Sequence, residues 1–128
     1  MKKKRVLLIE DQPLNMKLMR VLLDIDGYEV LEAVDAESGL AIARCEQPDL
    51  ILMDVQLPGI DGLTATRMIS EDPLLKHIHV IAVTSRAMSG DREKAMAAGC
   101  TGYMTKPIDT RTFTREISRV LQKTRLQD

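Results

Sequence analysis

The sequence predicts an α/β protein built on a doubly wound, five-stranded parallel sheet with five helices. The first observation is that short apolar runs alternate along the chain with stretches of helical period. The second is that strands separated by helices pair in parallel, and right-handed crossovers place those helices on both faces of the sheet. The third is the length of 128 residues, which suits one core, so residues 1–128 are expected to form a single domain.

The first strand and helix have distinct signals. Val6–Ile9 is apolar throughout, as expected of a strand covered on both faces. Pro13 favours the start of a helix, because its fixed φ suits the first helical position. Gly27 stands where a left-handed residue would end that helix. The spacing i, i+3, i+4, i+7 predicts that the helix has one apolar stripe, formed by Leu18, Val21, Leu22 and Ile25.

The second and third strands continue the alternation. Tyr28–Ala33 is the second predicted strand, and Asp35 is expected to cap the helix after it. Pro48 ends the connection, and Leu50–Met53 is a third strand that is again apolar throughout. The helix between these strands is expected to have an inner face of Ala36, Leu40 and Ala43.

The second half of the chain gives the remaining elements. The dipeptide Pro58-Gly59 marks a loop, and a short helix is predicted over Gly62–Ser70. Val80–Val83 is the fourth strand, Ser89–Ala98 a helix capped by its first residue, and Gly102–Met104 a weaker fifth strand. The last helix is expected to run almost to the C-terminus, with an apolar face of Phe113, Ile117, Val120 and Leu121.

The composition excludes several classes of protein. The 18 Lys and Arg residues nearly balance the 19 Asp and Glu residues, so a net charge of −1 gives no overall reason to expect binding to nucleic acid or membrane. No apolar run approaches the ~20 residues of a transmembrane helix, and Val6–Ile9, the apolar stretch after the basic N-terminus, is shorter than the roughly 7–15 residues of a signal peptide. Cys45 and Cys100 are expected to be reduced packing residues of a cytosolic protein.

The last helix has a cationic stripe that predicts a solvated face or a surface for an acidic partner: Arg111, Arg115, Arg119 and Lys123.

Polar side chains follow four of the five predicted strands. Glu10 and Asp11 follow the first strand, Asp54 the third, Thr84 the fourth and Lys106 the fifth. Each alone is explained as a cap, a turn residue or a surface charge. Because parallel strands all end at the same edge of a sheet, however, these side chains are expected to converge on one rim, where ligands bind in such folds.

The chemistry of that rim favours a metal and a phosphate. Close carboxylates repel one another unless a cation is present, and Mg²⁺ prefers carboxylate, water and phosphate oxygens. Glu10 and Asp11 suit the metal, while Thr84 and Lys106 would bind phosphate oxygens. Asp54 stands alone after its strand, so it is the candidate nucleophile, with an aspartyl phosphate as the product.

These residues closely resemble the receiver domain of bacterial response regulators, the CheY-like fold, over essentially the whole chain. That family places its strands in the order 2-1-3-4-5. The matching segments are Val6–Asp11, Leu50–Asp54, the loop Pro58–Gly62, Val80–Thr84 and the pair Lys106-Pro107.

The resemblance implies a role for each residue of the rim. The side chains of Glu10, Asp11 and Asp54, with the Gln56 backbone carbonyl, would bind Mg²⁺, for which Mn²⁺ substitutes. Asp54 would accept a phosphoryl group from a histidine kinase or a histidine phosphotransfer protein. The domain would catalyse its own phosphorylation and dephosphorylation, and it is not expected to be an enzyme that acts on other substrates. The resemblance implies that Thr84 and Lys106 would bind the oxygens of the phosphoryl group, and that Lys106-Pro107 would be a cis peptide. It also implies that Tyr103 swings inward together with Thr84 on activation.

Within the family the chain is most similar to DivK-type single-domain regulators. An attached output domain is not expected, so the signal would pass by protein–protein contacts to a target such as a kinase or a diguanylate cyclase. The protein is expected to act in the cytoplasm, in the control of the cell cycle or cell fate. Two positions depart from the family pattern. Ser85 replaces the usual Ala, and Arg86 places a long cation beside the phosphorylation site, which bears on the rate of dephosphorylation.

Two other functions share parts of this pattern. A haloacid dehalogenase-type phosphatase also uses an aspartate and Mg²⁺, but it normally has a second Asp two residues after the nucleophile, where this chain has Gln56. A flavodoxin-like carrier would have a phosphate-binding loop rich in Ser, Thr and Gly after the first strand, where this chain has Glu10, Asp11 and Gln12. A dinucleotide-binding domain is excluded more firmly, because no G-x-G-x-x-G occurs.

Overall fold

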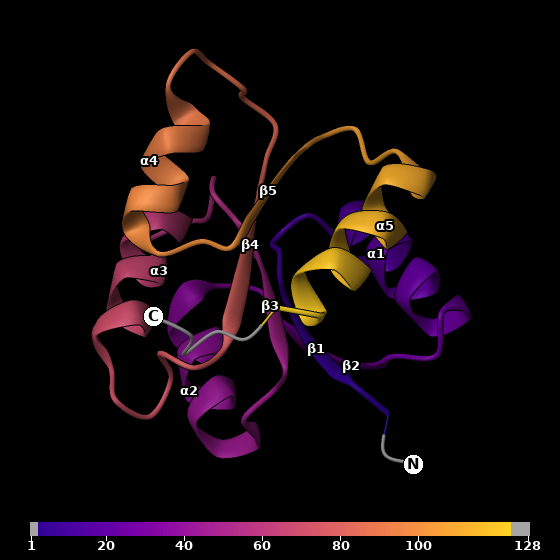
Figure 1. Cartoon of the computed structure of the whole chain (residues 1–128), viewed down its shortest axis with the longest axis horizontal. Coiled ribbons are helices and arrows are strands. Elements are labelled where there is room, and N and C mark those ends of the chain that lie inside the picture. Colours follow the sequence, from indigo (N-terminus) through magenta and orange to yellow (C-terminus); the bar gives the residue numbers. More distant parts are fainter. Residues whose placement is uncertain (1–2, 124–128) are drawn as a thin grey trace.

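A computed structural model describes residues 3–123 as a central sheet with helices on both faces (Figure 1). The sheet has five parallel strands in the order β2-β1-β3-β4-β5, which confirms the predicted fold class and strand order. The strands are β1 (Arg5–Ile9), β2 (Glu29–Ala33), β3 (Leu50–Asp54), β4 (His79–Thr84) and β5 (Gly102–Thr105).

The helices form two layers on the sheet. Helices α1 and α5 cover one face, and α2, α3 and α4 cover the other, as the right-handed crossovers require (Figure 1). Their bounds are α1 (Pro13–Ile25), α2 (Ala36–Glu46), α3 (Gly62–Glu71), α4 (Asp91–Ala98) and α5 (Thr110–Leu121).

The core explains why the strands read as continuous apolar runs. Every residue of β3 and β4 is buried, because helices cover both faces of these central strands. Alternate side chains of β1 enter different clusters: Val6 and Leu8 pack with α1 and α5, whereas Leu7 and Ile9 pack with α2 and α3. The two half-cores hold the sheet rigid and so fix the positions at which its strands end.

The apolar stripe predicted for α1 is wrong in detail. The side chains that α1 buries are Met16, Met19 and Leu23, and only Leu22 of the predicted stripe packs against the core. The others remain in solvent, with Ile25 75% exposed. Helix α1 is apolar on more than one side, so its periodicity alone does not decide which side meets the sheet. Its outer strip consists of Leu14, Leu18, Val21 and Ile25.

The predicted helix ends are confirmed in part. The Asp35 carboxylate caps α2 by accepting a hydrogen bond from the Ser38 N–H at 2.8 Å. The predicted cap at Ser89 is wrong: α4 begins at Asp91, after Gly90 at a φ of 89°. The Asp91 carboxylate instead accepts a hydrogen bond from the Met88 N–H at 2.9 Å, which fixes the loop before α4.

Two further expectations concern the end of the chain and the cysteines. Helix α5 ends at Leu121, and the part of the predicted C-terminal helix beyond residue 123 lies outside the described residues. Cys100 is buried, as predicted, but Cys45 is exposed on α2, so it is not a packing residue. Among residues 3–123 there is no helix with the length and apolar character needed to cross a membrane.

Candidate functional site

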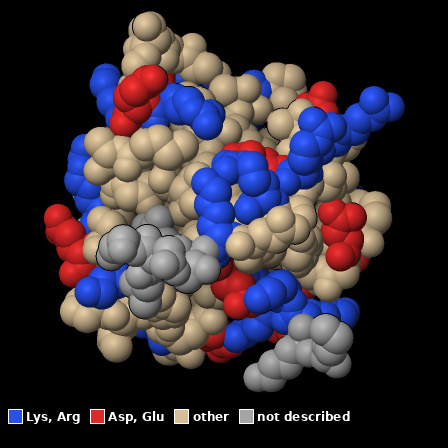
Figure 2. Space-filling model, in the orientation of Figure 1, with Lys and Arg blue, Asp and Glu red and all other residues tan. Residues whose placement is uncertain are grey.

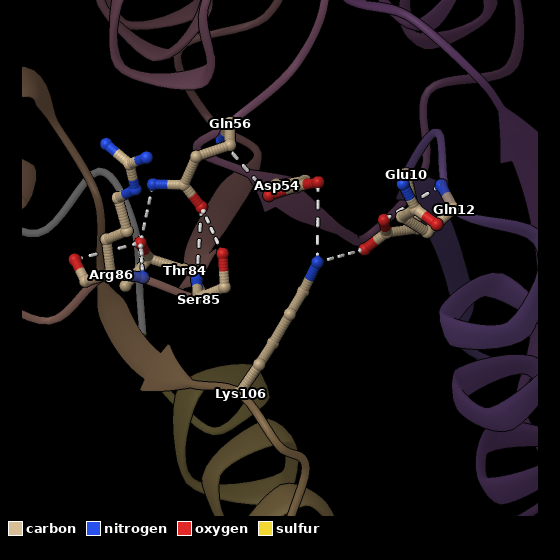
Figure 3. A network of polar contacts seen from close by, with 8 residues as sticks. All are labelled: Glu10, Gln12, Asp54, Gln56, Thr84, Ser85, Arg86 and Lys106. Atoms are coloured by element: carbon tan, nitrogen blue, oxygen red, sulfur yellow. Dashed lines mark hydrogen bonds and ion pairs between the residues drawn. The ribbon is translucent and has the colours of Figure 1, made fainter.

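Four strand ends bring the predicted site residues to one edge of the sheet. Glu10 follows β1, Asp54 ends β3, Thr84 ends β4 and Lys106 follows β5 (Figure 3). The register pairs Asp54 with Val83, and the Lys106 N–H donates to the Thr84 carbonyl at 2.8 Å, so the last three strands are level at this edge. The peptide bond from Lys106 to Pro107 is cis, as the family resemblance implies.

A single ammonium group lies between two buried carboxylates. The Lys106 Nζ is 2.8 Å from Glu10 Oε1 and 3.4 Å from Asp54 Oδ2 (Figure 3). The side chains of Glu10 and Asp54 are 0% and 3% exposed. Because one ammonium lies between two buried carboxylates, it attracts both of them but can neutralise only one of their two negative charges.

The environment of Asp54 disfavours its charged form. Burial is the largest cause and the neighbouring Glu10 carboxylate adds repulsion, so the pKa of Asp54 rises from 3.8 to about 6. The Lys106 ammonium and a hydrogen bond from the Gln56 N–H to Oδ1 at 3.1 Å oppose this rise. At neutral pH, Asp54 is therefore mostly ionised although its surroundings disfavour the charge, as suits a group that binds a cation or acts as a nucleophile.

The donor set at this edge fits a hard divalent cation. Glu10, Asp11 and Asp54 each offer a carboxylate oxygen, and these oxygens lie within 4.8 Å of one another. Glu10 and Asp54 share the ammonium of Lys106, so among the described residues the three carboxylates carry more negative charge than this ion pair offsets. Asp11 is the most exposed of the three, so one side of the cluster is open to solvent. Oxygen donors with room for water are what Mg²⁺ requires.

The loop after Asp54 depends on a glycine. A Cβ at Gly62 would lie 2.3 Å from the Asp54 carbonyl oxygen and 2.8 Å from the Val55 Cα, closer than any side chain can approach. The Gly62 N–H donates to the Val55 carbonyl at 3.0 Å, and the Asp61 carboxylate caps α3 by accepting a hydrogen bond from the Thr64 N–H at 2.9 Å. The start of α3 thus closes the loop that holds Asp54 and Gln56.

Thr84 belongs to a second polar network on the other side of Asp54. Its Oγ1 accepts hydrogen bonds from Gln56 Nε2 at 2.8 Å and from the Arg86 N–H at 3.1 Å, and it donates to the Arg86 carbonyl at 3.2 Å. Gln56 Oε1 in turn accepts from the N–H of Ser85 at 3.0 Å (Figure 3). Sequence reasoning assigned Gln56 only a backbone role, because nothing in the chain indicates where a loop amide will point.

Tyr103 borders a cavity beside Thr84. The cavity has a volume of about 240 Å³, and its wall includes Val55, Leu63, Met88 and Ala95 as well as Thr84. The Tyr103 side chain is half-buried, and its hydroxyl is buried without a hydrogen-bond partner among the described residues. An unpaired buried hydroxyl costs about 1–3 kcal/mol, so the hydroxyl destabilises this position of the ring.

Known proteins match both the sequence and this geometry. Residues 6–118 match the response regulator receiver domain. The polar-differentiation response regulator DivK of Brucella anthropi is 45% identical over 118 residues, which cover 92% of this chain and 96% of DivK.

Solved structures give the same result. The receiver domain of a sensor histidine kinase from Pseudomonas aeruginosa, with a magnesium ion coordinated in its active-site cleft, superposes with a TM-score of 0.87 at 33% identity, over 95% of this chain and all of that one. A CheY-like receiver domain protein from Methanospirillum hungatei has a TM-score of 0.86 at 28% identity, over 94% of each chain. The protein is thus a member of the response regulator receiver domain family, a module of two-component signalling.

Proposed function

We propose that Asp54 is the phosphoacceptor of this receiver and takes its phosphoryl group from a phosphohistidine. An Asp54 carboxylate oxygen attacks phosphorus, the P–N bond breaks, and the imidazole leaves with the bonding electron pair while the new P–O bond forms an aspartyl phosphate. The observation that carries this proposal is the position of Asp54: a 3% exposed carboxylate at the end of β3, 3.4 Å from Lys106 and within a cluster of acids.

The surrounding residues supply binding and charge. Glu10, Asp11, Asp54 and the Gln56 carbonyl are proposed to hold Mg²⁺, which would offset the charge of the carboxylates and of the incoming phosphoryl group; Mn²⁺ offers the same oxygen-ligand chemistry. Lys106 would shift from Asp54 towards a phosphoryl oxygen, since it already lies 3.4 Å from Oδ2. Thr84 would donate a hydrogen bond from its hydroxyl to another phosphoryl oxygen. The transfer then needs no residue from another protein besides the donor histidine, and the later hydrolysis of the acyl phosphate needs none.

Phosphorylation is proposed to move Thr84 and Tyr103 together. A Thr84 hydroxyl drawn towards Asp54 would vacate space in the 240 Å³ cavity that Tyr103 borders. The unpaired hydroxyl of Tyr103 supports two ring positions of similar free energy, so a modest change in contacts suffices to shift their populations. The surface formed by α4, β5 and α5 would report this change to a target protein.

The outer strip of α1 suits a helical donor. Leu14, Leu18, Val21 and Ile25 are exposed and follow one another at intervals of four, three and four residues, the spacing with which helices pack side by side. Helix α1 begins three residues after Glu10, so a helix docked on this strip could present a histidine to the acidic edge. This supports a histidine kinase or a histidine phosphotransfer protein as the partner.

The target is proposed to be another signalling protein. DivK of Brucella anthropi, a polar-differentiation response regulator that this chain covers over 96% of its length, supports a role in the control of the cell cycle or cell fate. A kinase or a diguanylate cyclase is proposed as the target. Figure 2 shows Lys and Arg side chains gathered over α5, where Arg111, Arg115 and Arg119 are exposed, so an acidic target surface fits. Neither Cys45 nor Cys100 forms a disulfide bond, which supports a location in the cytoplasm.

Acetyl phosphate provides a test without a partner. Incubation with acetyl phosphate and Mg²⁺ should add one phosphoryl group by intact mass, and Asp54→Asn should not gain it. Asp24→Asn, which changes an exposed carboxylate of α1, is the control and should label like the wild type. Equal labelling of Asp54→Asn would exclude Asp54. Steady release of inorganic phosphate from phosphomonoesters, with no accumulation of phosphorylated protein, would favour the phosphatase alternative.

A further inference from the structure

We propose that the side chain of Gln56 is a positioning residue that holds Thr84 away from Asp54 until phosphorylation. This inference rests on the proposed function, because it assigns to Gln56 a part of the free-energy difference between the resting and the switched position of Thr84. It concerns the carboxamide alone and is separate from the backbone carbonyl of the same residue.

The orientation of the Gln56 carboxamide follows from its partners. The Ser85 N–H can only donate, and it lies 3.0 Å from one end of the amide, so that end is the oxygen. The Ser85 hydroxyl lies 3.2 Å from the same oxygen. The amide nitrogen must then face Thr84, where Nε2 donates to Oγ1 at 2.8 Å (Figure 3). Gln56 therefore joins the loop after β3 to the end of β4.

The hydroxyl of Thr84 is fully engaged in this arrangement. It has one proton, which it donates to the Arg86 carbonyl at 3.2 Å, and its oxygen accepts from Gln56 and from the Arg86 N–H. Among the described residues it makes no hydrogen bond to Asp54. To donate to a phosphoryl oxygen, the hydroxyl must leave the Arg86 carbonyl and turn away from the Gln56 amide. The contact with Gln56 thus stabilises the resting position and is lost in the switched one.

The size of the effect follows from one exchanged hydrogen bond. A ligand that binds only the switched form has an apparent affinity that is reduced by the fraction of molecules in that form. Because Gln56 is exposed, its hydrogen bond to Thr84 is expected to change that fraction by about two- to fivefold. A residue that merely tied the two loops together would stabilise both forms, and its loss would lower the affinity or leave it unchanged.

The test compares Gln56→Met with Ser85→Ala. Gln56→Met keeps the length of the side chain and the backbone carbonyl but loses the amide. Ser85→Ala keeps the Ser85 N–H, so the Gln56 amide stays oriented towards Thr84. NMR spectra give the amide shifts of residues 84 and 85 without phosphate analogue, and a titration with beryllofluoride and Mg²⁺, in which beryllofluoride stands in for a phosphoryl group on Asp54, gives the apparent affinity.

The expected result is a two- to fivefold higher apparent affinity in Gln56→Met, with its resting shifts displaced towards those of the beryllofluoride-bound wild type. Ser85→Ala should match the wild type in the titration. A wild type that responds to beryllofluoride, together with a Gln56→Met variant of equal or lower affinity, would overturn the role of Gln56 and leave the proposed function standing. A wild type that shows no response at Asp54 would overturn the proposed function, and the role of Gln56 with it.

Discussion

Replacing Asp54 by Asn is expected to stabilise the metal-free protein at neutral pH. The pKa of Asp54 is raised to about 6 by burial and by Glu10, so the folded state binds its proton more tightly than the unfolded state does. A carboxyl group with a raised pKa lowers the stability as pH increases from about 4 to about 6, and the full penalty applies above that range. Asn resembles the protonated carboxyl in shape and carries no charge, so the variant lacks this penalty.

The magnitude follows from the shift in pKa. A rise from 3.8 to about 6, at 1.36 kcal/mol for each pKa unit, corresponds to roughly 2–3 kcal/mol. The opposing attraction of Lys106 is already contained in this figure, because it is one of the causes of the net shift. At roughly 4 °C for each kcal/mol in a domain of this size, the melting temperature should rise by about 8–12 °C.

The assay is urea unfolding followed by circular dichroism, with EDTA present, at pH 7.5 and at pH 4.5. The gap between Asp54→Asn and the wild type should be largest at pH 7.5 and should fall to about a third of that value at pH 4.5. Asp24→Asn, at an exposed position, should show no such gap. Equal stabilities of Asp54→Asn and the wild type at pH 7.5, or a gap that is independent of pH, would refute this account of the carboxylate cluster.

Three other variants test different parts of the site. Tyr103→Phe removes a buried hydroxyl that has no partner among the described residues, so thermal unfolding should show a protein more stable by about 1 kcal/mol; a loss of stability would mean that the hydroxyl is paired. Gly62→Ala places a Cβ against the Asp54 carbonyl, so urea unfolding should show a loss of about 1–3 kcal/mol in stability, and labelling by acetyl phosphate should be slower. An unchanged stability and labelling rate would show that the loop can move to make room for the methyl group. Lys106→Met removes the ammonium 2.8 Å from Glu10, so Mg²⁺ should raise the melting temperature of this variant at least as much as that of the wild type. Its labelling by acetyl phosphate should fall at least tenfold. A lost response to Mg²⁺ would contradict separate roles for Lys106 and the acids.

The sheet could be predicted because its signals are local and redundant. The apolar runs of β1, β3 and β4 reflect burial on both faces, and parallel pairing follows from the helices between them. The buried side of α1 could not be predicted, because Met16 and Leu18 have similar apolar character and only packing against the sheet separates them. The start of α4 was missed for a related reason: Ser89 and Asp91 are both good caps, and the left-handed Gly90 between them decides.

The candidate site could be predicted at the level of positions but not of contacts. Parallel strands end at one edge, so Glu10, Asp54, Thr84 and Lys106 converge whatever their rotamers are. The link from Gln56 to Thr84 joins residues 28 positions apart through two loops, and it depends on side-chain angles that no pattern of residue types determines.

The site of phosphorylation itself tests the central claim most directly. A phosphorylated histidine phosphotransfer domain would serve as donor, and the product would be reduced with borohydride, which cleaves acyl phosphates and marks the aspartate by a change in peptide mass. The account predicts one marked residue, Asp54, with Glu10 and Asp11 unmarked, and transfer that stops when Mg²⁺ is removed with EDTA. A mark on Glu10 or Asp11, or stable phosphate elsewhere on the chain, would contradict it.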